Sequence, residues 1–586
     1  MKFYSCAWLL SLTLFATGCD EGKSPTKPDA PTSNESNKVS APVSVPKYDL
    51  AADPRKFANE KNKPADWAQW GGTSLRNNTP EGKGIPTEWD VGDFEDNGDW
   101  KVGSGKNIQW VARLGSQSFG NPVVANGRVL VGTNNGKGWL KRYPAETDVG
   151  CLLCFDAKDG KFLWQDSSEK LPQGRVVDWP EMGICCAACV EGDRVWYVSS
   201  RGEVKCLALN GNLDASGSGK DDSDEAKEKN KEAKSLWTVN MMKDWGTSQH
   251  NMCSCSITIA GDVLFVNTSN GVDEGHINLP QPHAPSFVAL NKDTGKVYWK
   301  DGSPGTNVLH GQWSSPTFAV IDGVPQVIFG GGDGWVYGFD ARGDGEGNSK
   351  ILWKFDANPK KAKYVLGGRA DRNHIIGTPV IYENKVYVAV GEDPEHAEGV
   401  GHLYGLDPTK RGDISLELAV KRDDPTKTSI PIRRNQYVIE AEGEIAIPNP
   451  NSGALWHYAA VDRNKNGKIE FEETMHRTVG TCAIKNGLLY IADFSGLFHC
   501  VDAKTGNVHW TYDMKAETWS TPLIVEDKVY IGNANGEIIV FRLSDKMEEL
   551  AKNDMKGPVY STPIIANNKL YISSQNYLFQ IETIDR

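Results

Sequence analysis

The stretch GTCAIKNGLLYIADFSGLFHCVDAKTGNVHW, residues 480–510, decides the fold. Two β-rich runs are separated by a polar turn at Asn486 and Gly487, which is typical of an antiparallel hairpin. A third run ends in an Asp/Asn-x-x-x-Gly turn at residues 502–506, and a fourth run carries Trp510. The unit is therefore predicted to be a sheet of four antiparallel strands.

The same unit recurs along the chain. Its copies begin at Gly120, Cys185, Cys255, Ser314, Ile376, Gly480, Ser520 and Ser561. Sixty Gly and nineteen Trp agree with many glycine turns and large aromatic anchors. We therefore predict an all-β, eight-bladed β-propeller of four-stranded antiparallel blades over residues 66–586. An open solenoid, or two smaller propellers, is the alternative.

The first and last units suggest how the ring closes. Trp110 and Trp164 are 54 residues apart, and so are Trp456 and Trp510. The eighth unit ends without a fourth strand, whereas the strand around Trp110 precedes the first unit. We expect that strand to complete the last blade, because this pairing removes an open sheet edge.

Two insertions interrupt the repeat. Residues 212–234 are highly charged and are expected to form a solvated loop without an assigned role. Residues 408–475 form a longer insertion in the fifth blade. Long loops of this kind often serve partners, so we expect the second insertion to protrude.

The N-terminus has the features of a bacterial export signal. An apolar run follows Lys2 and leads to Ala16-Thr17-Gly18-Cys19. Small residues before a cysteine are typical of a lipobox, so we predict a lipoprotein signal peptide over residues 1–19 with lipidation at Cys19. A soluble exported protein is the alternative. Residues 20–65 are polar and are predicted to be a disordered tether.

The charge balance narrows the class of partner. The formal net charge is -12, and Lys and Arg form no basic stripe. Because such a surface repels phosphate backbones, we expect no nucleic-acid partner. A lipid anchor at Cys19 would instead place the protein at a membrane.

The motif DRNKNGKIEFEE, residues 462–473, has the spacing of an EF-hand calcium loop. Ca²⁺ takes six to eight oxygen ligands, and the glycine at the sixth position permits a sharp turn. The expected ligands are Asp462, Asn464, Asn466, Lys468 through its backbone carbonyl, and Glu473. We predict one structural calcium site that pins the insertion.

The loop GEDPEHAEGVGH, residues 391–402, concentrates acidic and histidine side chains. They are Glu392, Asp393, Glu395, His396, Glu398 and His402. Because loops between blades line the mouth of a propeller channel, this cluster could bind a metal or a polar ligand. A solvated acidic loop is the alternative.

From about Trp67 onward, the units resemble the pyrroloquinoline-quinone-like (PQQ-like) repeats of quinoprotein alcohol dehydrogenases and of BamB-type envelope lipoproteins. The motifs HGQWSSPTF, GGGDGWVYGFD and SGALWHY are similar to large exported propellers of planctomycete-type bacteria. In the dehydrogenases, the resemblance implies a vicinal disulfide against the quinone, and Cys185 and Cys186 would correspond to it. These cysteines could instead pair elsewhere or remain free.

Two main functions follow from these patterns. The BamB-type resemblance implies a non-catalytic binding or scaffold protein in the envelope of a Gram-negative-type bacterium. Its partners would be envelope proteins, a polar small molecule or a glycan. The alternative is a PQQ-dependent dehydrogenase that oxidises alcohols or sugars, with PQQ and calcium as cofactors. No match to the catalytic Asp of such an enzyme is evident in the sequence. A carbohydrate-binding propeller that uses exposed Trp is a third possibility.

Overall fold

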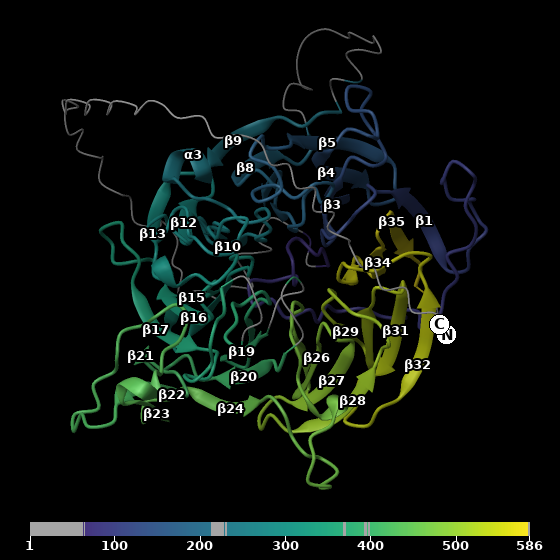
Figure 1. Cartoon of the computed structure of the whole chain (residues 1–586). Coiled ribbons are helices and arrows are strands. Elements are labelled where there is room, and N and C mark those ends of the chain that lie inside the picture. The colour runs from purple at the N-terminus through teal and green to yellow at the C-terminus, as the bar shows by residue number, and fades with distance from the viewer. Residues whose placement is uncertain are drawn as a thin grey trace, which may run out of the picture. The chain divides into compact units, whose positions relative to one another are not determined.

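The computed structural model describes residues 63, 65–211, 228, 231–366, 371–391, 395 and 399–583. The predicted signal peptide, Cys19 and nearly all of the predicted tether lie outside these residues. The strands form eight four-stranded antiparallel blades, arranged as a propeller around a central axis (Figure 1). The predicted fold class is confirmed.

Each blade begins with its innermost strand. Blade one contains β2 (Val123–Ala125), β3 (Arg128–Asn134), β4 (Val149–Asp156) and β5 (Phe162–Glu169). Blade two contains β6 (Cys189–Glu191), β7 (Arg194–Val198), β8 (Glu203–Ala208) and β9 (Ser235–Asn240). Blade three contains β10 (Thr258–Ala260), β11 (Val263–Asn267), β12 (Phe287–Asn291) and β13 (Val297–Asp301). Blade four contains β14 (Thr317–Ile321), β15 (Val324–Gly330), β16 (Trp335–Asp340) and β17 (Ile351–Asp356).

The second half of the ring repeats the pattern. Blade five contains β18 (Val380–Tyr382), β19 (Lys385–Val390), β20 (His402–Leu406) and β24 (Ala454–Tyr458). Blade six contains β25 (Ala483–Lys485), β26 (Leu488–Ala492), β27 (Leu497–Asp502) and β28 (Val508–Asp513). Blade seven contains β29 (Leu523–Val525), β30 (Lys528–Gly532), β31 (Glu537–Arg542) and β32 (Glu549–Asp554). Blade eight contains β33 (Ile564–Ala566), β34 (Lys569–Ser573), β35 (Tyr577–Ile581) and β1 (Ile108–Arg113).

Helical structure is short in this protein. The helical turns include α3 (Met241–Trp245), η2 (Gly305–Asn307), η3 (Glu440–Glu442) and η4 (Phe471–Glu473). Over the described residues, none of the helices has the length and apolar character needed to cross a membrane.

The ring closes as expected, through both ends of the chain. β1 pairs antiparallel with β35, with Val111 opposite Phe579 and Arg113 opposite Tyr577. The fourth strand of blade eight therefore comes from the N-terminal side of the propeller (Figure 1). This pairing covers an edge that would otherwise be open.

Four of the repeated tryptophans tie their own blade to the following one. Their indole N–H groups donate to turn carbonyls of that blade, from Trp110 to Ala157 at 3.3 Å, Trp164 to Leu209 at 3.1 Å, Trp299 to Ala341 at 3.1 Å and Trp456 to Ala503 at 2.9 Å. The turn glycine leaves room for the indole, because a Cβ on Gly160 would lie 2.5 Å from the Trp110 ring. The Trp and the turn Gly of the repeat thus form one joint between two blades.

Residues 65–79, called the hub segment below, bond to the innermost strand region of every blade. The partners, in blade order, are Val124, Val190, Ser256 with Ile257, Phe318, Ile381, Ile484, Ile524 and Asn567. Arg76 is fully buried and donates to Trp70 O at 2.6 Å and to Pro316 O at 3.0 Å. Five guanidinium N–H donors suit one side chain to bridge several carbonyls. The hub segment therefore joins all eight blades at the channel.

A second ring of bonds runs between neighbouring blades just before each innermost strand. A backbone N–H of one blade donates to a side-chain oxygen of the next, in the steps Ala187 to Ser256, Ser256 to Ser315, Ser315 to Thr378, Thr378 to Thr481, Thr481 to Thr521, Thr521 to Thr562 and Thr562 to Asn121. These bonds are 2.6 to 3.2 Å long. We call these side chains the hydroxyl ring. Blade two has Ala187 at this position, which offers no oxygen to blade one.

The first part of the 408–475 insertion packs onto blade four. β21 (Gly412–Asp413) pairs in parallel with β17, and β22 (Glu417–Lys421) pairs with β23 (Glu444–Pro448). Tyr437 and Val438 of the insertion belong to the same apolar cluster as strands of blades three and four. The insertion therefore widens the sheet of blade four, whereas the sequence suggested a protruding loop.

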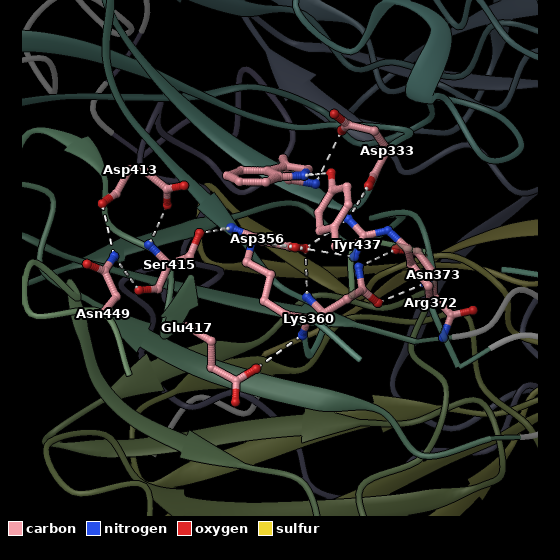
Figure 2. A network of polar contacts seen from close by, with 12 residues as sticks. Asp333, Asp356, Lys360, Arg372, Asn373, Asp413, Ser415, Glu417, Tyr437 and Asn449 are labelled. Atoms are coloured by element: carbon pink, nitrogen blue, oxygen red, sulfur yellow. Dashed lines mark hydrogen bonds and ion pairs between the residues drawn. The ribbon is translucent and has the colours of Figure 1, made fainter. Parts of the chain in front are cut away.

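Figure 2 shows a buried polar network where this insertion meets blade four. The Asp356 carboxylate accepts hydrogen bonds from Lys360 at 2.8 Å and from Arg372 at 3.1 Å. Burial raises the pKa of Asp356, but the two cations outweigh burial, and the pKa is lowered overall. The Arg372 guanidinium lies 4.1 Å from the centre of the Tyr437 ring, and Tyr437 accepts the Trp335 indole N–H at 2.7 Å. The network fastens the insertion to the blade.

We predict that Trp110→Ala destabilises the whole propeller. The change removes a large buried side chain and the joint between blades eight and one, so the free energy of unfolding should fall by about 3–5 kcal/mol. Denaturant unfolding followed by fluorescence would measure the effect. The matched change Val102→Ala, at a side chain that is 89% exposed, should leave stability nearly unchanged. If Trp110→Ala lowers the free energy of unfolding no more than Val102→Ala does, the role of this joint is contradicted.

Candidate functional site

The central channel contains a pocket of about 350 Å³, which we call the cup. Its lining includes the aromatic side chains Trp70, Phe119, Trp179, Trp313, Trp519 and Tyr560, and the polar side chains Asn121, Asn251, Ser254, Ser256, Ser315, Thr378, Glu395, Thr481, Thr521 and Thr562. Trp70 belongs to the hub segment, so this segment forms part of the wall. The cup has a volume in the range of small-ligand pockets.

The hydroxyl ring gives the cup its polar character. Each ring hydroxyl accepts a backbone N–H from the preceding blade, as described above. A hydroxyl oxygen that accepts one bond keeps its own O–H to donate. The ring therefore directs several donors toward the channel from equivalent positions in successive blades.

The aromatic side chains of the cup pack together on one part of its wall. Phe119 stacks on Tyr560 with ring centroids 4.6 Å apart, and Trp519 meets Phe119 edge to face at 5.5 Å. Phe119 and Tyr560 come from loops that lead into blades one and eight, and Trp519 from the loop into blade seven. An aromatic wall beside hydroxyl donors suits a ligand with both a flat apolar face and polar groups.

Cys185 lines the cup, whereas Cys186 is buried beside it. Cys186 Sγ donates to the Val198 carbonyl at 3.0 Å, and the two thiols are not bridged. Burial raises the pKa of Cys185 to about 12. All ten cysteines within the described part of the chain are free thiols. Cys185 therefore faces the cup, and the two thiols are not joined as a vicinal disulfide.

The acidic and histidine cluster of residues 391–402 is only partly described. Glu392, Asp393, His396 and Glu398 lie outside the described residues. Glu395 reaches the cup, and its Oε1 accepts a hydrogen bond from Asn251 Nδ2 at 3.1 Å. His402 lies elsewhere, in β20, with its Nδ1 3.0 Å from His457 Nε2. The structure thus separates Glu395 from His402.

Glu395 instead meets three histidines that the sequence pattern did not single out. They are His250, His276 and His310, which lie in three separate connections of blades two to four. Burial, followed by the neighbouring His310, lowers the pKa of His250 to about 3. No spacing rule links these residues, and only the fold brings them together.

The predicted calcium loop is a closed turn with its side-chain oxygens turned inward. Asp462 accepts the backbone N–H of Gly467 at 2.9 Å, and the buried Glu473 accepts the N–H groups of Arg463 at 2.9 Å and Asn464 at 3.1 Å. Asn464 and Asn466 accept the N–H groups of residues 466 and 468, and Gly467 has a φ of 81°. Four of the five predicted ligand residues therefore accept backbone N–H groups within this loop.

A comparison with models of protein families agrees with the repeat type predicted from the sequence. Residues 350–548 match the family model described as outer membrane protein assembly factor BamB. None of the curated proteins matches the chain. The resemblance to PQQ-like propellers, expected from the motifs, is confirmed.

A comparison with solved structures finds similar chains at low sequence identity. BamB from Moraxella catarrhalis is 13% identical, covers 81% of this chain and 97% of its own, and has a TM-score of 0.43. The quinohemoprotein alcohol dehydrogenase ADHIIG from Pseudomonas putida HK5 is 11% identical, with 92% and 83% coverage and a TM-score of 0.49. The quinohemoprotein alcohol dehydrogenase from Comamonas testosteroni is 11% identical, with 92% and 84% coverage and a TM-score of 0.43.

Proposed function

We propose that this chain is a non-catalytic binding protein of the bacterial cell envelope, which holds a small, uncharged, hydroxyl-rich ring ligand in the cup. The observation that carries the proposal is the combination of the hydroxyl ring with the aromatic wall. Aromatic faces pack on the apolar face of a sugar-like ring, and the ring hydroxyls of the protein pair with its oxygens. A saccharide is the simplest ligand of this chemistry.

We also propose that the protein is exported and anchored to a membrane by a lipid. Acylation of Cys19 would hold the protein at a membrane, and the tether over residues 20–65 would let the propeller stand clear of that surface. The match of residues 350–548 to a model of an outer-membrane assembly factor supports an envelope location. Envelope proteins that reach the blade edges would be its further partners.

We also propose that the loop of residues 462–473 binds a calcium ion. The loop follows β24 of blade five, and a bridge between Ala460 and Thr474 closes it. A bound ion would cross-link the two ends of this loop through Asp462 and Glu473. Its role would be structural, because the loop lies outside the cup lining.

The second candidate function is a PQQ-dependent dehydrogenase, which the position of Cys185 in the cup favours. The residues present do not fit that cofactor. PQQ carries three carboxylates, yet neither Lys nor Arg lines the described cup, and its one acidic residue, Glu395, adds negative charge. Burying such a ligand without cations is costly. We therefore rank this function second.

We predict that a neutral saccharide binds in the cup. Calorimetric titration of the full chain with glucose, N-acetylglucosamine and their disaccharides should give saturable binding for at least one of them. Trp519→Ala should weaken that binding about fivefold or more, since stacking on an aromatic face contributes roughly 1 kcal/mol beyond area burial.

The control for this experiment is Trp245→Ala, a half-buried tryptophan outside the cup, which should bind like the wild type. PQQ with calcium is the competing probe. Saturable PQQ binding together with dye-linked alcohol oxidation, and no saccharide binding, would replace the binding function with the dehydrogenase.

Calcium should raise the stability of the protein through Glu473. At calcium concentrations about a hundred times the dissociation constant, binding adds about 3 kcal/mol to the free energy of unfolding. Glu473→Gln should abolish the calcium-dependent part, and Glu472→Gln, an exposed neighbour outside the ligand positions, should keep it. Denaturant unfolding with calcium or with chelator measures both. Equal calcium responses of the two variants would remove the site from the proposal.

A further inference from the structure

Three histidines and one glutamate converge at the wall of the cup. His250 follows α3, His276 lies between β11 and β12, and His310 lies between β13 and β14. One ligand atom of each histidine and a Glu395 oxygen all lie within 4.8 Å of one another. This is the one group of three or more His, Cys, Asp or Glu side chains with that geometry in the described part of the chain.

The distances match the edges of a metal coordination shell. His310 Nε2 lies 3.4 Å from Glu395 Oε2, and His276 Nε2 lies 3.6 Å from the same oxygen. A tetrahedral shell with bonds of about 2.0–2.1 Å has ligand-to-ligand edges of about 3.3 Å. His250 Nε2 and His310 Nε2 are 2.8 Å apart, so a shared ion would need only a small widening of this pair.

Backbone and side-chain partners aim these ligands at a common point. His250 Nδ1 lies 2.9 Å from the Val272 carbonyl, a contact that directs Nε2 toward the other ligands when Nδ1 carries the proton. The N–H of Val272 donates to the backbone carbonyl of His310 at 3.0 Å, so one residue positions two histidines. Asn251 donates a hydrogen bond to Oε1 of Glu395. The other carboxylate oxygen, Oε2, is the one that lies near His276 and His310.

Burial gives the cluster a protected environment. His250 and His310 are almost completely buried, at 1% and 0% exposure, whereas His276 is partly exposed on its loop. Glu395 and Asn251 also line the cup. The cluster therefore has an access route from the cup and a dry side within the blades.

We propose that His250, His276, His310 and Glu395 bind one divalent transition-metal ion, of which Zn²⁺ fits the geometry best. Imidazole ligands suit Zn²⁺ and its first-row neighbours, whereas Ca²⁺ takes oxygen ligands. The bound ion would hold the Glu395 side chain at the wall of the cup. The site stands on its own geometry, apart from the ligand proposed for the cup.

Zinc titration of the full chain tests the site. The protein is first stripped with a chelator, then saturated with calcium to occupy the 462–473 loop, and titrated with Zn²⁺ against a chromophoric chelator. One Zn²⁺ per chain is expected. His276→Gln and His310→Gln should each weaken zinc binding at least 100-fold. Cobalt in place of zinc should give the visible absorption of a four-coordinate ion, which both variants should lose.

The control is His457→Gln, which alters the contact between His402 and the exposed His457, away from the zinc ligands. It should bind zinc within about threefold of the wild type. If His310→Gln does not fold, the partly exposed His276 decides the question. Zinc binding far below one ion per chain, or wild-type binding by His276→Gln, would overturn the site. Saccharide titration of the stripped protein tests the cup separately, so the two failures can be told apart.

Discussion

The antiparallel pairing of β1 with β35 is the constraint on which the rest of the structure depends. β1 and β35 come from opposite ends of the described chain, whereas every other blade takes its four strands from one continuous region of the sequence. A closed ring brings the innermost strands to a common axis, where the hub segment and the hydroxyl ring can form. The cup exists only because those two features meet there.

The regular and the irregular parts of the repeat have different roles. Equivalent positions supply the joints, namely the tryptophans, the turn glycines and the hydroxyl ring. The irregular loops before blades two, three and four supply Cys185, Asn251 and His310. This division agrees with the general rule that a rigid scaffold positions loops that carry the chemistry. The proposed metal site therefore rests on departures from the repeat, whereas the proposed ligand of the cup also depends on the regular hydroxyl ring.

Much of the fold could be predicted from the sequence, because its determinants are local. The Asp-x-x-x-Gly turn and the following Trp occur within one unit, so counting units gave the blades, and the unpaired strand at Trp110 indicated closure. The packing of the 408–475 insertion was harder to predict. Its packing on blade four depends on contacts such as Tyr437 with Trp335, which are about a hundred residues apart.

The candidate site could be predicted only in fragments. The loop with Glu395 stood out by composition, but its partners His250, His276 and His310 are single histidines in ordinary loops. The Ser or Thr before the first strand of most units is visible in the sequence, for example at Thr378 and Thr521. Its role in joining blades becomes evident only in the closed ring, where each side-chain oxygen accepts a backbone N–H of the neighbouring blade.

The hub segment also imposes an order on biosynthesis. Residues 65–79 leave the ribosome before any blade, yet they bond to all eight. Their last partners, in blade eight, are translated near the end of the chain. A nascent polypeptide therefore lacks a finished centre, and final assembly must wait until the last blade has been synthesised.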